Sequence, residues 1–161
     1  MPEFEPRLFH SDAEIERIGE GLLAASHAGC MAGRANARTL PREEWTHEAH
    51  LAATIYLLLK RPDIDLDKQL PDIIRKYNES AGGANSDSEG YHETITRVFL
   101  RGVRLFLAEA DPKEPLYELV NELLLSPMGR RDWPLRFYSP QRLFSVEARR
   151  DWIRPDLRSI P

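Results

Sequence analysis

Three of the five histidines stand where predicted helices begin. His47 and His50 are three residues apart at the start of one apolar helical pattern, and His92 opens a second pattern. Neutral imidazole is the commonest metal ligand among protein side chains, and a three-histidine site leaves positions open for water or substrate. If the two helices are parallel, the three rings meet at one end of a bundle. The spacing therefore predicts a site for a divalent metal ion, with Zn, Ni and Fe as the candidates.

A helical projection adds side chains to this predicted site. At about 100° per residue, His47 lies on the apolar stripe of its helix and His50 lies about 60° to one side. Glu43, four residues before His47, projects onto the same face and offers a carboxylate for acid–base chemistry. On the second helix, the same count places Thr96 beside His92 and makes Thr96 a candidate for ligand binding.

Helices must position these residues, and along most of the chain the apolar residues recur with the spacing of an α-helix. Capping signals and prolines predict five helices, at about residues 12–27, 41–59, 66–77, 92–110 and 112–125. Pro71 makes the start of the third helix uncertain by a few residues, because proline is tolerated only near a helix start. We expect an all-α, up-and-down bundle in a single domain over residues 1–161, with the bundle itself at about 12–125.

The composition changes after residue 126. Residues 127–161 hold five of the twelve prolines and two of the three tryptophans, which is too aromatic for a disordered linker. We expect this tail to wrap across the bundle, with one short helix begun by Ser139-Pro140. The side chains predicted to be buried there are Trp133, Phe137, Phe144 and Trp152.

An up-and-down order brings further side chains to the histidine end. Short connections favour antiparallel neighbours, so the third helix should end where the second and fourth begin. Tyr77 then becomes a second acid–base candidate besides Glu43, and Asn78 and Tyr91 become candidates for ligand binding. The glycine-rich connection at 81–90 lies at the same end.

Charge and composition narrow the partners. The net charge is −4, and the eight arginines of the tail are scattered among four acids and several prolines, so no basic stripe for nucleic acid forms. The acidic N-terminus lacks the layout of a signal peptide, and the longest apolar run, 51–59, is too short to span a bilayer. We therefore expect a cytoplasmic protein that binds neither nucleic acid nor membranes. The single cysteine, Cys30, excludes an internal disulfide.

Several functions fit these features. The first is a metal-dependent enzyme, a hydrolase, lyase or transferase, that acts on a small polar molecule. The alternative is a non-catalytic helical module that binds a ligand or a protein and whose histidines pack or form hydrogen bonds, and a third is a pH-sensitive ligand carrier. Helix 41–59 is apolar on both sides, with Trp45 and Tyr56 opposite the histidines, so a homodimer is a further alternative to burial by the chain's own tail.

Sequence motifs spread over most of the chain from residue 41 onward carry a resemblance to known proteins. The motifs Trp45-Thr46-His47-x-x-His50-Leu51, Gly90-Tyr91-His92-Glu93-Thr94 and Ala148-Arg149-x-x-Trp152-x-x-Pro155-Asp156-Leu157 resemble a family of small all-α bacterial proteins of uncharacterised function. This resemblance implies one helical domain and a bacterial, cytoplasmic origin, and it implies no activity. In outline the bundle is also similar to the DinB and YfiT type, which holds metal through three helical histidines. In that type the histidine pair is spaced four apart and comes late in the chain, whereas here it is spaced three apart and comes early.

Overall fold

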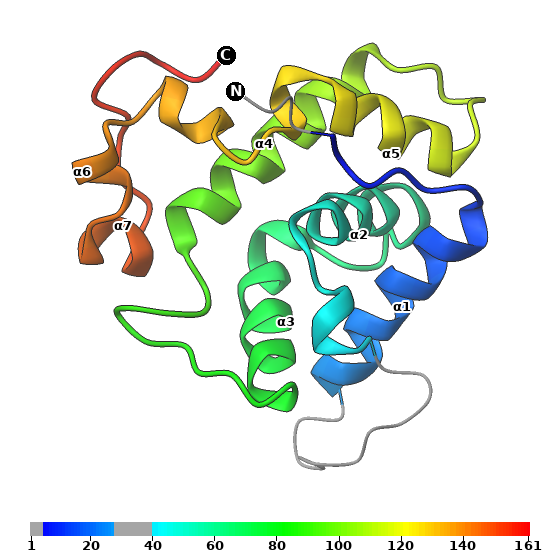
Figure 1. The fold of residues 1–161 in the computed structure, drawn as a ribbon, viewed down its shortest axis with the longest axis horizontal. Coiled ribbons are helices and arrows are strands. Elements are labelled where there is room, and N and C mark those ends of the chain that lie inside the picture. The colour runs from blue at the N-terminus through cyan, green and yellow to red at the C-terminus, as the bar shows by residue number, and fades with distance from the viewer. Residues whose placement is uncertain (1–4, 28–39) are drawn as a thin grey trace.

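The protein is all-α over the residues that a computed structural model describes, 5–27 and 40–161. Seven α-helices and three short 3-10 helices occur in this part of the chain, and no strand does (Figure 1). The long helices are α1 (Asp12–His27), α2 (His47–Lys60), α3 (Leu66–Ser80), α4 (Glu93–Glu109) and α5 (Leu116–Leu125). The shorter ones are η1 (Arg42–Glu44), η2 (Pro127–Gly129), η3 (Trp133–Arg136), α6 (Pro140–Leu143) and α7 (Val146–Arg150). The predicted all-α helical bundle is confirmed, and Cys30 lies outside the described residues.

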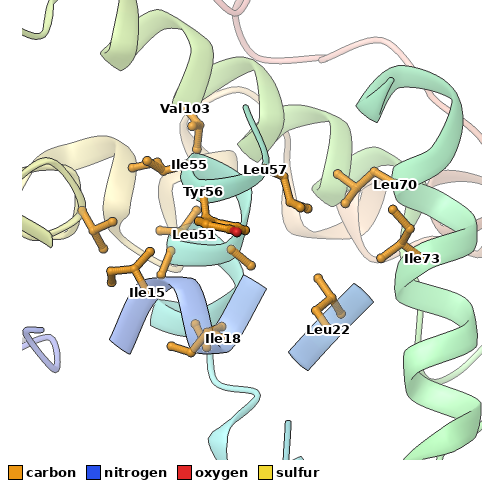
Figure 2. Close-up of a cluster of buried hydrophobic side chains, with 14 of the residues drawn as sticks. Ile15, Ile18, Leu22, Leu51, Ile55, Tyr56, Leu57, Leu70, Ile73 and Val103 are labelled. Atoms are coloured by element: carbon orange, nitrogen blue, oxygen red, sulfur yellow. The ribbon is translucent and has the colours of Figure 1, made fainter. Parts of the chain in front are cut away.

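The main core lies where α1, α2 and α3 meet. Figure 2 shows Ile15 and Ile18 of α1 facing Leu51 and Ile55 of α2, and all four side chains are at most 2% exposed. Burying an aliphatic side chain of this size contributes about 1.5–3 kcal/mol, so this layer supplies much of the stability that positions the helices. None of the helices within 5–27 and 40–161 has the length and apolar character that crossing a bilayer requires.

Both sides of α2 are covered within one chain. Tyr56, on the side away from the histidines, is 5% exposed because its ring lies against Gly19 of α1. A Cβ at Gly19 would stand 2.1 Å from this ring, so the close approach of α1 and α2 needs glycine there. The two-sided apolar pattern of α2 is therefore explained by α1, rather than by the tail. The homodimer stays a prediction.

The second helix begins later than the sequence pattern suggests. Pro41 starts the short η1, the chain then turns at Trp45, and α2 begins at His47. Thr46 is the N-cap, since its Oγ1 accepts a hydrogen bond from the Ala49 N–H at 3.2 Å. The projection that placed Glu43 one turn before His47 on the same helix is therefore wrong.

Pro71 lies inside α3, where it leaves one backbone carbonyl without its usual helical partner. Proline has no N–H, so the carbonyl of Asp67, four residues earlier, receives no helical hydrogen bond from it. Arg97 of α4 supplies the missing donor, with its Nη2 2.8 Å from the Asp67 oxygen. The same contact joins α3 to α4.

The C-terminal tail packs on α4 and forms a second core. Figure 1 shows α6 and α7 beside the first turns of α4. Trp133 and Phe137 are buried there, as predicted, together with Val98, Tyr138 and Leu143. The prediction was wrong for two residues: Phe144 is 63% exposed and Trp152 is 43% exposed. Polar anchors hold the last segment instead, such as the Tyr138 hydroxyl, which donates to the Ile153 carbonyl at 2.6 Å.

Replacing Gly102 by alanine should destabilise the junction between α4 and the tail. A Cβ at this position would lie 2.7 Å from the indole of Trp133, so the ring must move. Overpacking of this kind costs about 1–3 kcal/mol, which exceeds the 0.5–1 kcal/mol that alanine gains over glycine inside a helix. Urea denaturation should show a net loss of about 1–2 kcal/mol. In a Trp133→Leu background the loss should disappear, and an equal loss there would show that the indole is not its cause.

Candidate functional site

A cavity of about 320 Å³ lies between the first four long helices, and His47 and His50 form part of its wall. The other lining side chains are mostly aliphatic or aromatic, and they come from α1, α2, α3 and α4, with Arg131 from the tail. Thr96 lines it as well. The apolar walls are formed mainly by Leu22, Leu57, Leu70, Ile74, Phe99 and Leu100.

A backbone carbonyl of the tail fixes the His47 ring. Its Nε2 lies 2.8 Å from the carbonyl oxygen of Gly129 at the end of η2. A carbonyl only accepts, so Nε2 must carry the hydrogen and donate it, and in the neutral ring Nδ1 then keeps a lone pair. The edge of the ring packs on Phe99 of α4, with 5.2 Å between the ring centroids.

His50 is fixed in the opposite tautomer. Its Nδ1 lies 2.6 Å from the carbonyl oxygen of Thr46, one turn earlier, so Nδ1 donates and Nε2 keeps the lone pair. Trp45 stacks on the ring, with 3.6 Å between the centroids and 28° between the planes. The turn before α2 makes this stacking possible, and it places Trp45 beside the histidine rather than opposite it.

The two lone-pair nitrogens, Nδ1 of His47 and Nε2 of His50, have no hydrogen-bond partner among the described residues. In that same part of the chain, no fully buried side-chain nitrogen or oxygen lacks a partner. His47 and His50 are both half-buried. Since both rings line the cavity, the pair presents two hydrogen-bond acceptors there.

Both rings are neutral at physiological pH. Burial lowers the pKa of His50 to about 4, against the raising effect of the Thr46 carbonyl. Burial also lowers the pKa of His47, with the Gly129 carbonyl acting in the opposite direction. The positive charge of Arg131 adds to the lowering at both rings. The pair thus keeps its lone pairs free of protons.

The structure does not bring His92 to this pair. His92 is the N-cap of α4, with extended backbone angles (φ −131°, ψ 110°), and its Nδ1 accepts a hydrogen bond from the Ile95 N–H at 3.1 Å. Its Nε2 donates to the Leu143 carbonyl of α6 at 2.9 Å. The helical projection fails here because a cap residue does not have helical angles. Both ring nitrogens are therefore occupied: Nδ1 caps α4, and Nε2 fixes α6 to α4.

The other candidates lie outside the cavity. Glu43 is exposed on η1. Tyr77 and Asn78 line a smaller, more polar cleft of about 200 Å³ on the far side of Trp45. The Tyr77 hydroxyl donates to the Leu40 carbonyl at 2.9 Å, and burial raises its pKa to about 12. Tyr91 is buried and donates to the Glu93 carboxylate at 2.7 Å. Of the acid–base and ligand-binding candidates, Thr96 is therefore the one that lines the histidine cavity.

The residues present do not fit the predicted three-histidine metal centre. Within 5–27 and 40–161, no three His, Cys, Asp or Glu side chains are grouped so that they could hold an ion. His47 and His50 offer one nitrogen each, and the third expected ligand is engaged elsewhere. Arg131, at the same wall, also disfavours a dication.

Two features of the site were missed by the sequence reasoning. Arg131 was counted among the scattered arginines of the tail, and no local signal separates it from its neighbour Arg130. The carbonyl of Gly129 that orients His47 carries no side-chain signature at all. Compared with family models, curated proteins and solved structures, the chain gives no match. The resemblance drawn from the motifs stays a prediction.

Proposed function

We propose that the protein binds a small, largely apolar molecule in the cavity, and that His47 and His50 accept hydrogen bonds from its polar group. The observation that carries this proposal is the pair of oriented, neutral imidazoles facing an apolar space. Small-molecule sites are apolar concavities of about 300–1,000 Å³ with a few placed polar groups. The cavity of about 320 Å³ is in this range, and an engineered apolar cavity of about 150 Å³ in another protein already holds benzene.

His92 supports this interpretation by contrast. A structural histidine uses both ring nitrogens inside the protein, as His92 does with Ile95 and Leu143. His47 and His50 each use one nitrogen on a backbone carbonyl, and both rings line the cavity. Orienting one nitrogen through the other is how proteins present imidazole to a bound partner.

Binding is favoured over catalysis by the weak basicity of the pair. An efficient general base has a pKa near the working pH, whereas burial lowers the pKa of His50 to about 4. The predicted acid–base residues Glu43 and Tyr77 do not line the cavity. The site therefore suits recognition of a hydrogen-bond donor better than proton transfer.

Binding of 2-naphthol and naphthalene, followed by amide shifts in two-dimensional NMR, tests the proposal. Both compounds should shift resonances of residues around the cavity, and 2-naphthol should bind about fivefold tighter, since one hydrogen bond contributes about 1 kcal/mol. An Ala53→Leu variant narrows the cavity wall and should abolish both interactions, while Ala108→Leu, at an exposed position of α4, should change neither. Absence of binding at millimolar concentration, or binding that survives Ala53→Leu, would overturn the proposal.

A further inference from the structure

Among the eight arginines of the tail, Arg131 is the one on the described lining of the histidine cavity, and it forms no ion pair with a carboxylate of the described residues. Arg130 forms an ion pair with Asp132, with 3.1 Å between Nε and the carboxylate oxygen, and Arg150 forms one with Asp87 at 2.5 Å. In the sequence, Arg131 stands between Arg130 and Asp132, but it takes no part in their ion pair and lines the histidine cavity. Its guanidinium is therefore available to a bound molecule.

The cavity has one formal charge on its described lining, and that charge is positive. The lining includes no Asp, Glu or Lys side chain in the described part of the chain. His47 and His50 are neutral, and Arg131 is close enough to lower the pKa of both. Such an unbalanced cation beside apolar walls favours an anionic ligand.

The chemistry of the donors and acceptors selects the kind of anion. One planar guanidinium matches a carboxylate through two parallel hydrogen bonds. A phosphate group presents more anionic oxygens than one guanidinium satisfies, and the lone pairs of His47 and His50 would repel the remaining oxygens. Those two nitrogens instead accept from a hydroxyl or N–H group on the same ligand.

We infer that the cavity is selective for an apolar monocarboxylic acid, whose carboxylate pairs with Arg131 while its apolar body fills the space between α2, α3 and α4. The inference rests on the proposed function, because it names the class of molecule that the same site binds. Arg131 acts as the specificity-determining residue. A hydroxyl or N–H group on the ligand's body adds hydrogen bonds to the imidazole pair.

Three probes that share a naphthalene ring test this inference by calorimetry and NMR. They are 2-naphthoate, its methyl ester and 2-naphthol. We expect 2-naphthoate to bind at least about tenfold tighter than the ester, because charge-assisted hydrogen bonds are worth about 1.5–3 kcal/mol. Arg131→Gln should remove this preference and leave the affinity for 2-naphthol within about twofold. Arg136→Gln removes the same charge from an exposed position outside the cavity and should preserve the preference.

The outcomes separate the two proposals. Equal affinities of the wild-type protein for 2-naphthoate and its ester would overturn the carboxylate inference and leave the small-molecule site intact. A preference lost equally in Arg131→Gln and Arg136→Gln would also overturn the inference, because it would reflect net charge rather than a contact. Failure of all three probes to bind would overturn the inference and the proposed function together.

Discussion

Replacing His92 by leucine should lower the free energy of unfolding by about 2–4 kcal/mol, the largest loss expected from a single substitution outside the apolar core. Leucine removes the N-cap of α4, and loss of a cap costs about 0.5–2 kcal/mol. It also leaves the Leu143 carbonyl of α6 without its donor, and a buried unsatisfied polar group costs about 1–3 kcal/mol. Chemical denaturation of the purified variant measures the sum.

Two matched variants separate these contributions. His92→Asn keeps an acceptor in the position of Nδ1, so it should retain the hydrogen bond from Ile95 and recover about 1 kcal/mol of the loss. His10→Leu changes an exposed histidine and should cost less than about 0.5 kcal/mol. A loss below about 0.5 kcal/mol for His92→Leu would contradict the assignment of His92 as the residue that fixes α6 to α4.

The sequence pattern predicts the helices well where local signals agree. Helix α1 begins and ends within the expected 12–27 because the capping signal at Ser11 and the apolar period both indicate it. For α2 the two signals disagree: Pro41 favours an early start, but Thr46 supplies the cap that is used. Boundaries of this kind depend on which of two competing caps has the better contacts, and those contacts are tertiary.

The candidate site was partly predictable for the same reason. His47, His50 and Thr96 line one cavity because each lies within a regular helix, where spacing fixes direction. His92 could not be placed by spacing, since a cap residue has extended angles and directs its side chain elsewhere. Arg131 comes from a tail without a regular period, and it reaches the cavity because the neighbouring η2 packs against α4.

The three histidines show how the surroundings of a ring decide its role. All three have a lowered pKa, and burial is the largest cause each time. They differ at the second ring nitrogen, which accepts from a backbone N–H in His92 but has no hydrogen-bond partner among the described residues in His47 and His50. Type and spacing alone therefore favour one metal centre, whereas the hydrogen bonds show one structural link at His92 and a separate pair, His47 and His50, that we propose for ligand recognition.

Acid should destabilise the protein through His50 over a defined pH range. Burial lowers the folded-state pKa of His50 to about 4, against an ordinary value of 6.5. Between these values the unfolded chain binds a proton that the folded chain does not, so stability is lost as the pH falls from about 6.5 to about 4 and then levels off for this group. Each pKa unit corresponds to about 1.4 kcal/mol, so the loss from His50 amounts to about 3 kcal/mol.

The variant His50→Asn isolates this contribution. Asparagine does not titrate, and its amide can donate to the Thr46 carbonyl in place of Nδ1, so the helix start is preserved. Urea denaturation at a series of pH values measures this contribution. Between pH 6.5 and 4, the free energy of unfolding should fall by about 3 kcal/mol more in the wild type than in the variant. His92 and the carboxylates titrate in both proteins, so their effects cancel in the difference. Parallel curves would mean that the folded protein admits a proton on His50 at no cost, which would contradict the neutral acceptor on which recognition in the cavity depends.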